Sequence, residues 1–295
     1  MPDAPSARER FAPAWGSRTY VMGIVNVTPD SFSGDGITDP SQAVAQGLAL
    51  AENGADILDV GGESSRPGGS PVDTDEELAR VVPVIEGLHR RTDLPISVDT
   101  RRAAVAEAAL AAGATMVNDV WGFRGDPDLA GVTAAASAWA IAVHNRQAAA
   151  VTVPGLGGFF PHVAYDDVVE EIIGELHGSI ALLLDAGLSE DRIIVDPGFG
   201  FGKGPDQNLQ LLARLGELKS LGKPILLGTS RKSTIGLVLD LPPSERADGT
   251  AATVAIGIQN GADIIRVHDL PAMARVARMA DAIVRGWSRV EPSLG

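Results

Sequence analysis

One unit recurs along residues 21–286 and constrains the fold more than any other feature: a short apolar run, a Gly/Pro/Asp-rich turn, and an Ala/Leu/Glu-rich amphipathic stretch. The runs predict eight strands, at 20–26, 56–60, 95–98, 115–118, 139–143, 192–196, 224–228 and 263–267. The amphipathic stretches predict helices at 41–53, 75–91, 101–112, 126–137, 167–186, 207–220, 248–260 and 270–286. This alternation is typical of parallel strands joined by helical crossovers.

Eight such units without a linker between them favour a single closed (β/α)8 barrel over residues 18–286, with short tails at 1–17 and 287–295. Length alone would suggest about two domains, but single barrels of about 250 residues are common. A doubly wound sheet is the alternative. It would usually have fewer strands and a Gly-rich fingerprint after the first of them.

Composition excludes several classes of protein. The chain has no cysteine, which rules out a disulfide scaffold, a thiolate zinc site and a cysteine nucleophile. Its 24 basic and 38 acidic side chains give a net charge of −14, which disfavours nucleic acid and anionic lipid as partners. Hydrophobic residues make up 45% against 21% charged, so the chain can bury a large core and is not a disordered polymer.

The N-terminal residues carry no recognisable targeting signal. Residues 1–15 contain Pro, acidic and Arg residues without an apolar stretch of the kind that a secretory signal needs. No run of about 18 apolar residues could span a bilayer. We therefore expect a soluble, cytoplasmic protein.

Polar residues follow every predicted strand. The C-terminal strand ends and the loops after them build the active site of a (β/α)8 barrel. In chain order these positions hold Asn26, Asp59, Glu63, Arg66, Asp99, Asn118, Asp119, His144, Asp196, Ser230, Arg231, Lys232, Arg266 and His268. One such residue alone would be a helix cap or a turn former, but so many on one rim predict an active site. Asp59 is interpreted as structural, and a helix cap is an alternative role for Asp119.

The chemistry of this rim predicts a ligand with two parts. Positive charge gathers there in an otherwise acidic chain, at Arg66, Arg231, Lys232, Arg266 and His268. That charge favours an anionic group such as phosphate or diphosphate. The fixed donors and acceptors of Asp99, Asn118 and Asp196 suit a planar heterocycle with an amino group and a ring N–H.

The segment 196–203 resembles a nucleotide loop but lacks the required spacing. Its glycines stand at 198, 200 and 202, so a GxGxxG motif would need glycine in place of Lys203. A Walker A motif would need Gly in place of Pro197 and Ser or Thr in place of Gly204. We interpret the segment as a turn that brings its backbone and Phe201 close to a flat ligand, with Asp196 pointing inward.

Taken together, these motifs strongly resemble the dihydropteroate synthase family, over nearly all of 18–286. The resemblance rests on the segments 23–33, 59–68, 97–100, 118–120, 196–203, 230–232 and 266–269. It implies a (β/α)8 barrel, a homodimer, and a transferase of folate biosynthesis that is a sulfonamide target. The implied reaction joins 6-hydroxymethyl-7,8-dihydropterin diphosphate to p-aminobenzoate, with Mg²⁺, and yields 7,8-dihydropteroate and diphosphate.

Carried over position by position, the resemblance divides the site into three parts. It implies pterin binding by Asp99, Asn118, Asp196 and Lys232. It implies diphosphate binding by Asn26, Arg66, Arg266 and His268, with Asn26 also at the metal. It implies an aminobenzoate site formed by Phe32, Ser65, Pro67, Phe201 and Ser233. The residues it implies as catalytic are Asp99, Lys232, Arg66 and Asp35, the last standing in a first loop that reads 34–36 Gly-Asp-Gly where the family commonly has Asp-Gly-Gly.

The chemistry is consistent with ionisation before attack. Departing diphosphate develops negative charge that Mg²⁺ and arginines stabilise, while the electron-rich pterin carries the positive charge left on its methylene. An aromatic amine is neutral and nucleophilic at pH 7, so no strong general base is needed.

Two other functions remain as alternatives. A methyltetrahydrofolate-using corrinoid methyltransferase has a similar pterin-binding barrel, but it handles no diphosphate and has no need of the 230–232 motif. A pterin-binding homologue could instead have kept the pocket and lost turnover through the altered first loop. A coupled diphosphate-release assay separates the second from an enzyme.

Overall fold

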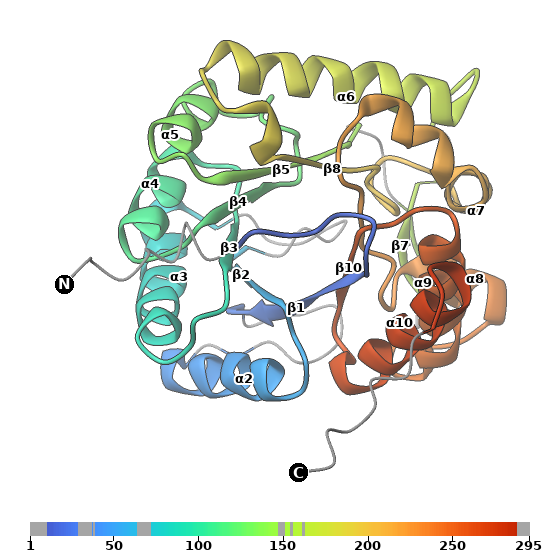
Figure 1. Ribbon diagram of the computed structural model, residues 1–295, viewed down its shortest axis with the longest axis horizontal. Coiled ribbons are helices and arrows are strands. Elements are labelled where there is room, and N and C mark those ends of the chain that lie inside the picture. The colour runs from blue at the N-terminus through green and yellow to red at the C-terminus, as the bar shows by residue number, and fades with distance from the viewer. Residues whose placement is uncertain are drawn as a thin grey trace.

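The computed structural model describes residues 11–28, 37, 39–63, 72–146, 151–153, 156–160 and 163–287. All eight predicted strands are found in one parallel sheet: β1 (Tyr20–Asn26), β2 (Ile57–Gly61), β3 (Ile96–Asp99), β4 (Met116–Asp119), β5 (Trp139–Val143), β8 (Ile193–Asp196), β9 (Leu226–Leu227) and β10 (Ile264–Val267). The strand order is β8-β5-β4-β3-β2-β1-β10-β9, and a parallel bridge between Val195 and Ile225 joins its two ends. The predicted (β/α)8 barrel is confirmed (Figure 1).

Helices surround the strands on the outside (Figure 1). They are α2 (Pro40–Glu52), α3 (Thr74–His89), α4 (Ala103–Ala111), α5 (Leu129–Ala135), α6 (Val168–Asp185), α7 (Pro205–Ala213), α9 (Ala247–Gln259) and α10 (Leu270–Val284). Asp39, Asp73 and Asp167 begin α2, α3 and α6, because each carboxylate accepts first-turn backbone N–H groups. The stretch expected as one helix at 207–220 divides into α7 and a 3-10 helix, η2 (Leu215–Leu221). None of the helices described is both long and apolar enough to traverse a bilayer.

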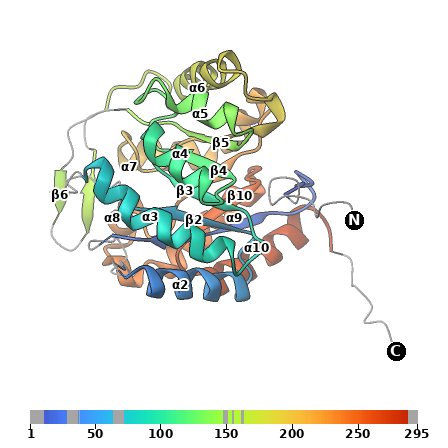
Figure 2. The same cartoon turned by 90° about the vertical axis from the view of Figure 1, so that its left-hand side faces the viewer.

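One α-helix and two strands among the described residues were not predicted. Helix α8 (Ser233–Leu239) lies between β9 and α9, and the strands β6 (Val151–Val153) and β7 (Gly157–Phe159) pair as an antiparallel hairpin in the long connection after β5. The hairpin packs beside α8, and β6 projects from one side of the molecule (Figure 2). Strands of three residues are too short to show the alternation on which a sequence-based prediction rests.

The barrel interior is apolar toward the N-terminal ends of the strands and polar toward their C-terminal ends. Side chains alternate along each strand, so residues such as Met22, Ile57 and Met116 form an inner cluster while their neighbours pack against the helices. The N-terminal end of the barrel is closed by edge-to-face contacts among four aromatic rings, those of Phe11, Trp15, Tyr20 and Trp139. The same alternation directs the polar residues near the C-terminal strand ends into the barrel mouth.

Candidate active site

The C-terminal ends of the strands bring the predicted pterin residues together. Asp99 and Asp196 are the last residues of β3 and β8, and Asn118 is next to last in β4. In the strand register Asp99 stands beside Asn118, and Gly61 stands beside both Asp99 and Asn26. The half-buried Asn26 therefore opens on the same mouth from the end of β1.

Arg266 joins two carboxylates at this mouth. Its Nε donates to Asp59 Oδ2 over 2.6 Å, and its Nη2 donates to Asp99 Oδ2 over 2.8 Å. Burial and, in smaller measure, the neighbouring Asp59 charge raise the pKa of Asp99 to about 7, although the Arg266 charge opposes the shift. The protonation of Asp99 is thus poised to change near neutral pH.

Asp59 also orients Asn118. Asn118 Nδ2 donates to Asp59 Oδ2 over 3.2 Å, and because a carboxylate only accepts, this contact fixes which way the amide points. Asn118 Oδ1 is buried without a hydrogen-bond partner among the described residues, as is Asp59 Oδ1. Asp59 was interpreted as structural, and its hydrogen bonds to the side chains of Asn118 and Arg266 fit that interpretation. The interpretation missed that both of these partners are themselves predicted site residues. Alternation from the inward Ile57 along β2 was the signal that points Asp59 inward.

The charges of Asp196 and Lys232 attract each other at the barrel mouth. Burial raises the pKa of Asp196 and lowers that of Lys232 to about 8, and each charge opposes the shift of the other. Asp196 Oδ1 accepts the Gly198 N–H over 2.6 Å. The Lys232 ammonium donates to Phe199 O and lies 4.1 Å from the centre of the Phe201 ring.

The segment 196–203 is the turn that we expected, and its glycines are required by close backbone approach. Gly198 and Gly202 have φ of +68° and +59°. A Cβ atom at Gly198 would lie 1.8 Å from His144 O, and one at Gly202 would lie 2.3 Å from Arg146 O. Only glycine fits either position, so the turn presses against the end of β5.

The loops after β9 and β10 meet through Ser230. Its Oγ is 2.9 Å from His268 Nδ1 and accepts the His268 N–H over 3.2 Å. Arg231, predicted as part of the anion-binding charge, forms an ion pair with Asp269, its Nε 2.8 Å from Oδ2. Ser233 is the first residue of α8.

Several predicted site residues lie outside the described residues, namely Phe32, Asp35, Ser65, Arg66 and Pro67.

Asp119 has a different role from its neighbour Asn118, because it points to the outer face of β4. Its carboxylate accepts the N–H groups of Trp121 over 2.9 Å and Phe123 over 2.6 Å. It therefore caps the turn after β4 and not the following helix, as the alternative had it, because α5 begins only at Leu129 with Asp128 at its N-cap.

Comparison with known proteins points to one family. A family model described as pterin binding enzyme matches residues 22–268. The dihydropteroate synthase of Clostridium beijerinckii is 47% identical over 272 residues, covering 92% of this chain and 96% of that protein. The Bacillus subtilis dihydropteroate synthase is 46% identical over 268 residues, covering 90% of this chain and 89% of its own.

Solved structures agree with these relatives. The dihydropteroate synthase of Clostridium difficile, determined in the presence of pteroic acid, has a TM-score of 0.84 and 48% identity, covering 93% of this chain and 100% of that one. The Xanthomonas albilineans dihydropteroate synthase with 4-aminobenzoic acid has a TM-score of 0.81 and 44% identity, covering 90% of this chain and 93% of its own.

Proposed function

This chain belongs to the pterin binding enzyme family, and we propose the roles that the residues at its barrel mouth have in the dihydropteroate synthase reaction. The chain is a transferase that condenses 6-hydroxymethyl-7,8-dihydropterin diphosphate with p-aminobenzoate to 7,8-dihydropteroate and diphosphate. The observation that carries the residue roles is the convergence of Asp99, Asn118, Asp196 and Lys232 at the C-terminal end of one barrel.

The pterin ring lies among these four residues in our proposal. The buried Asn118 Oδ1 accepts a ring donor, since Asp59 already holds the amide nitrogen. Asp196 uses Oδ1 for the Gly198 amide, so its other oxygen accepts from the ring. The Lys232 ammonium donates to ring acceptors, and Asp99 faces the part of the ring where positive charge develops.

The diphosphate lies toward Asn26, Arg266 and His268 in this proposal, together with Arg66. Arg266 uses two nitrogens on carboxylates, and its Nη1 makes no hydrogen bond to the described residues. Leaving-group charge is stabilised by such fixed cations without reorganisation.

Magnesium fits this half of the site. The described residues contain no group of three His, Cys, Asp or Glu side chains that could hold a metal. Mg²⁺ is usually held by one or two protein oxygens together with substrate phosphates and water, and the Asn26 carboxamide at the mouth suits that donor set. When bound, the ion would neutralise charge on the leaving diphosphate.

The aminobenzoate half of the proposal includes Phe201 and Ser233 from the described residues, and Phe32, Ser65 and Pro67. Phe201 presents its ring beside Lys232, and Ser233 follows Lys232 at the start of α8. The aromatic amine attacks without a strong base, because it is already neutral.

Diphosphate release tests the proposal directly. Purified protein, the dihydropterin diphosphate, p-aminobenzoate and Mg²⁺ should release diphosphate and form 7,8-dihydropteroate in equal amounts, with little turnover when the metal is chelated. A corrinoid methyltransferase would instead transfer a methyl group from methyltetrahydrofolate. A protein that binds the pterin but releases no diphosphate would be the non-catalytic homologue.

Substrate binding is expected to be ordered, with the dihydropterin diphosphate first. If the diphosphate leaves before attack, its contacts must assemble before aminobenzoate is needed. Calorimetric titration should show weak aminobenzoate binding to the enzyme alone and tighter binding once pterin, diphosphate and Mg²⁺ are present. Equal affinity in both titrations would favour a preformed site and direct displacement.

Pterin affinity should fall as the pH rises above about 8. The pKa of Lys232 is lowered to about 8, so its ammonium loses its proton above that pH and can no longer donate charge-assisted hydrogen bonds to the ring. The Lys232→Ala variant should bind pterin more weakly and lose this alkaline limb. Titrations between pH 6.5 and 9.5 check both points, and a variant that kept the limb would assign it to another group.

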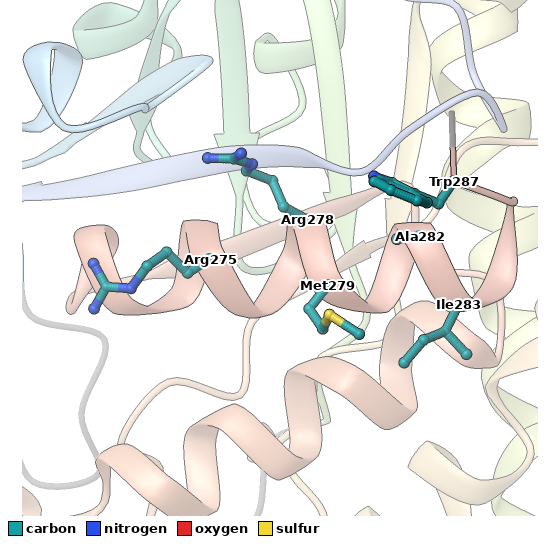
Figure 3. A pocket seen from close by; sticks show the side chains of 6 residues that line it. All are labelled: Arg275, Arg278, Met279, Ala282, Ile283 and Trp287. Carbon is teal, nitrogen blue, oxygen red and sulfur yellow. The ribbon is translucent and has the colours of Figure 1, made fainter. Parts of the chain in front are cut away.

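We propose that two copies associate through the late helices, in the regions 207–220, 248–260 and 270–286. Met279 and Ile283 project from one side of α10 and are 62% and 68% exposed, and Ile256 on α9 is 48% exposed (Figure 3). A hollow of about 610 Å³ lies along α10 beside them. Apolar exposure of this extent favours a subunit interface. Light scattering at micromolar concentration should give twice the monomer mass of 30.5 kDa, and the monomer mass would refute the dimer.

The cellular setting stays a prediction. The net charge of −14 favours small-molecule substrates over nucleic acid or anionic membranes as partners. We also propose a cytoplasmic location.

A further inference from the structure

Lys203 lies behind the glycine turn and is almost completely buried, with 1% of its surface exposed. Its Nζ is 2.9 Å from each of three acceptors, Gly198 O, Phe201 O and His144 Nδ1. An ammonium group has three N–H donors and no acceptor. A protonated Lys203 therefore satisfies all three contacts at once, and it joins both ends of the turn to the residue after β5.

His144 is in the state that such a contact needs. Burial and the nearby cations lower the pKa of His144 to about 2, so its ring is neutral. Its Nε2 lies 3.1 Å from Glu175 Oε2, outside regular hydrogen-bond geometry. A carboxylate neighbour favours the proton on Nε2, which leaves Nδ1 to accept from Lys203.

Opposing effects act on the Lys203 charge. Burial, together with the charges of Lys232 and Arg146, lowers the pKa of Lys203 well below its ordinary value, although Asp196 and Glu175 oppose the shift. A neutral amine has only two N–H donors, so it would leave one of the three acceptors facing a lone pair in a buried place. The hydrogen-bond pattern therefore favours the charged form at neutral pH.

The groups that Lys203 holds are those of the pterin half of the site. Gly198 O and Phe201 O belong to the turn whose Gly198 N–H binds Asp196 Oδ1. The same turn supplies Phe199 O and the Phe201 ring to the Lys232 ammonium. Removing Lys203 would release the turn and would take a positive charge from behind Asp196.

We propose that Lys203 is a positioning residue of the dihydropteroate synthase reaction: its buried ammonium holds the turn 198–202 in place and keeps Asp196 ionised for the pterin ring. This inference rests on the proposed role of Asp196 in pterin binding. Lys203 itself reaches neither substrate, since all its donors are used within the protein.

The test compares Lys203→Met with the unmodified enzyme. Methionine has nearly the same length but no charge and no donor, so the dissociation constant of the dihydropterin diphosphate should rise by about 10- to 100-fold. Asp196 is faced by Lys203, Lys232 and Arg266, and loss of one cation should raise its pKa. As the pH is lowered, Lys203→Met should therefore lose pterin affinity at a pH about one unit higher than the pH at which the unmodified enzyme loses it.

Lys223 supplies a matched control. It is a second buried lysine, 6% exposed, whose Nζ donates to Glu190 O and Oε1 near the other end of the barrel. Lys223→Met should lower stability without changing pterin affinity or its acid limb. Equal pterin binding by the unmodified enzyme and Lys203→Met would overturn the inference and leave the proposed function intact. Absence of pterin binding by the unmodified enzyme would overturn the proposed function, and the inference with it.

A measurement on the unmodified protein covers the case in which Lys203→Met does not fold. Nitrogen-15 spectra of the lysine Nζ groups should contain one ammonium signal with slow hydrogen exchange at pH 7, absent from Lys203→Gln, which keeps an amide donor in place of the charge. A neutral amine signal for Lys203 at pH 7 would refute the role in keeping Asp196 ionised.

Discussion

Replacing Arg266 with methionine is expected to lower the free energy of unfolding by about 3–5 kcal/mol, because it leaves the fully buried Asp59 carboxylate without its ion-pair partner. The pKa of Asp99, already raised to about 7, should rise further. An acid whose pKa is higher in the folded state binds extra protons there, so its penalty shrinks as the pH falls. The deficit measured by urea unfolding should therefore be smaller at pH 5.5 than at pH 8.

Two variants test the cause of this loss. Arg18 also forms a short ion pair, with Asp56, but its side chain is 51% exposed, so Arg18→Met should cost no more than about 1 kcal/mol. Adding Asp59→Asn to Arg266→Met should restore part of the stability, because the stranded charge is then gone. An Arg266 variant as mild as Arg18→Met, or a double variant less stable than Arg266→Met, would show that Asp59 does not need this partner.

Asp196→Asn is expected to keep the fold and to weaken pterin binding by about 2–4 kcal/mol, which is roughly 30- to 1,000-fold in the dissociation constant. The carboxylate accepts the Gly198 amide through one oxygen and a ring N–H through the other in our proposal. Asparagine must place an NH₂ group against one of these donors. Calorimetry with the dihydropterin diphosphate measures the loss.

Asp263→Asn is the control for this variant. Asp263 is also buried, and its Oδ2 accepts from the Ile225 N–H and from the Lys219 ammonium, so it has the same kinds of contact ahead of β10. That variant should lose stability and keep pterin affinity. Unchanged pterin binding by Asp196→Asn would make Asp196 a turn residue only.

The barrel was predictable because its strands carry strong and regular patterns. β1 and β5 were predicted at their observed bounds, and every other predicted strand lies within a residue or two of the observed one. β9 is shorter than expected, since it pairs with β10 only at Leu226 and Leu227 and ends before Gly228. α8 was missed because a seven-residue helix directly after Lys232 has too few turns to show a period.

The site was predictable in its residue types and less so in their contacts. Strand alternation and the barrel rule placed Asn118 and Asp196 at the mouth. The burial of Lys203 could not be foreseen, because a lysine after a glycine-rich turn is usually exposed and its three acceptors come from backbone positions and from His144, far away in the sequence. The pairing of Arg231 with Asp269 was likewise hidden, since motif membership says nothing about which charge a side chain faces.

The seam of the barrel, which is the junction between β8 and β9, links ligand binding to local opening of the barrel. β8 and β9 are joined by the isolated bridge between Val195 and Ile225, whereas every other neighbouring pair shares a ladder. Asp196 ends β8 on one side of the seam, and Lys232 follows β9 on the other. A pterin held by both residues would act as an extra rung across the seam, and would slow hydrogen exchange of the backbone amides there more than between β2 and β3. Substrate binding and closure of the barrel would then be one mechanical event.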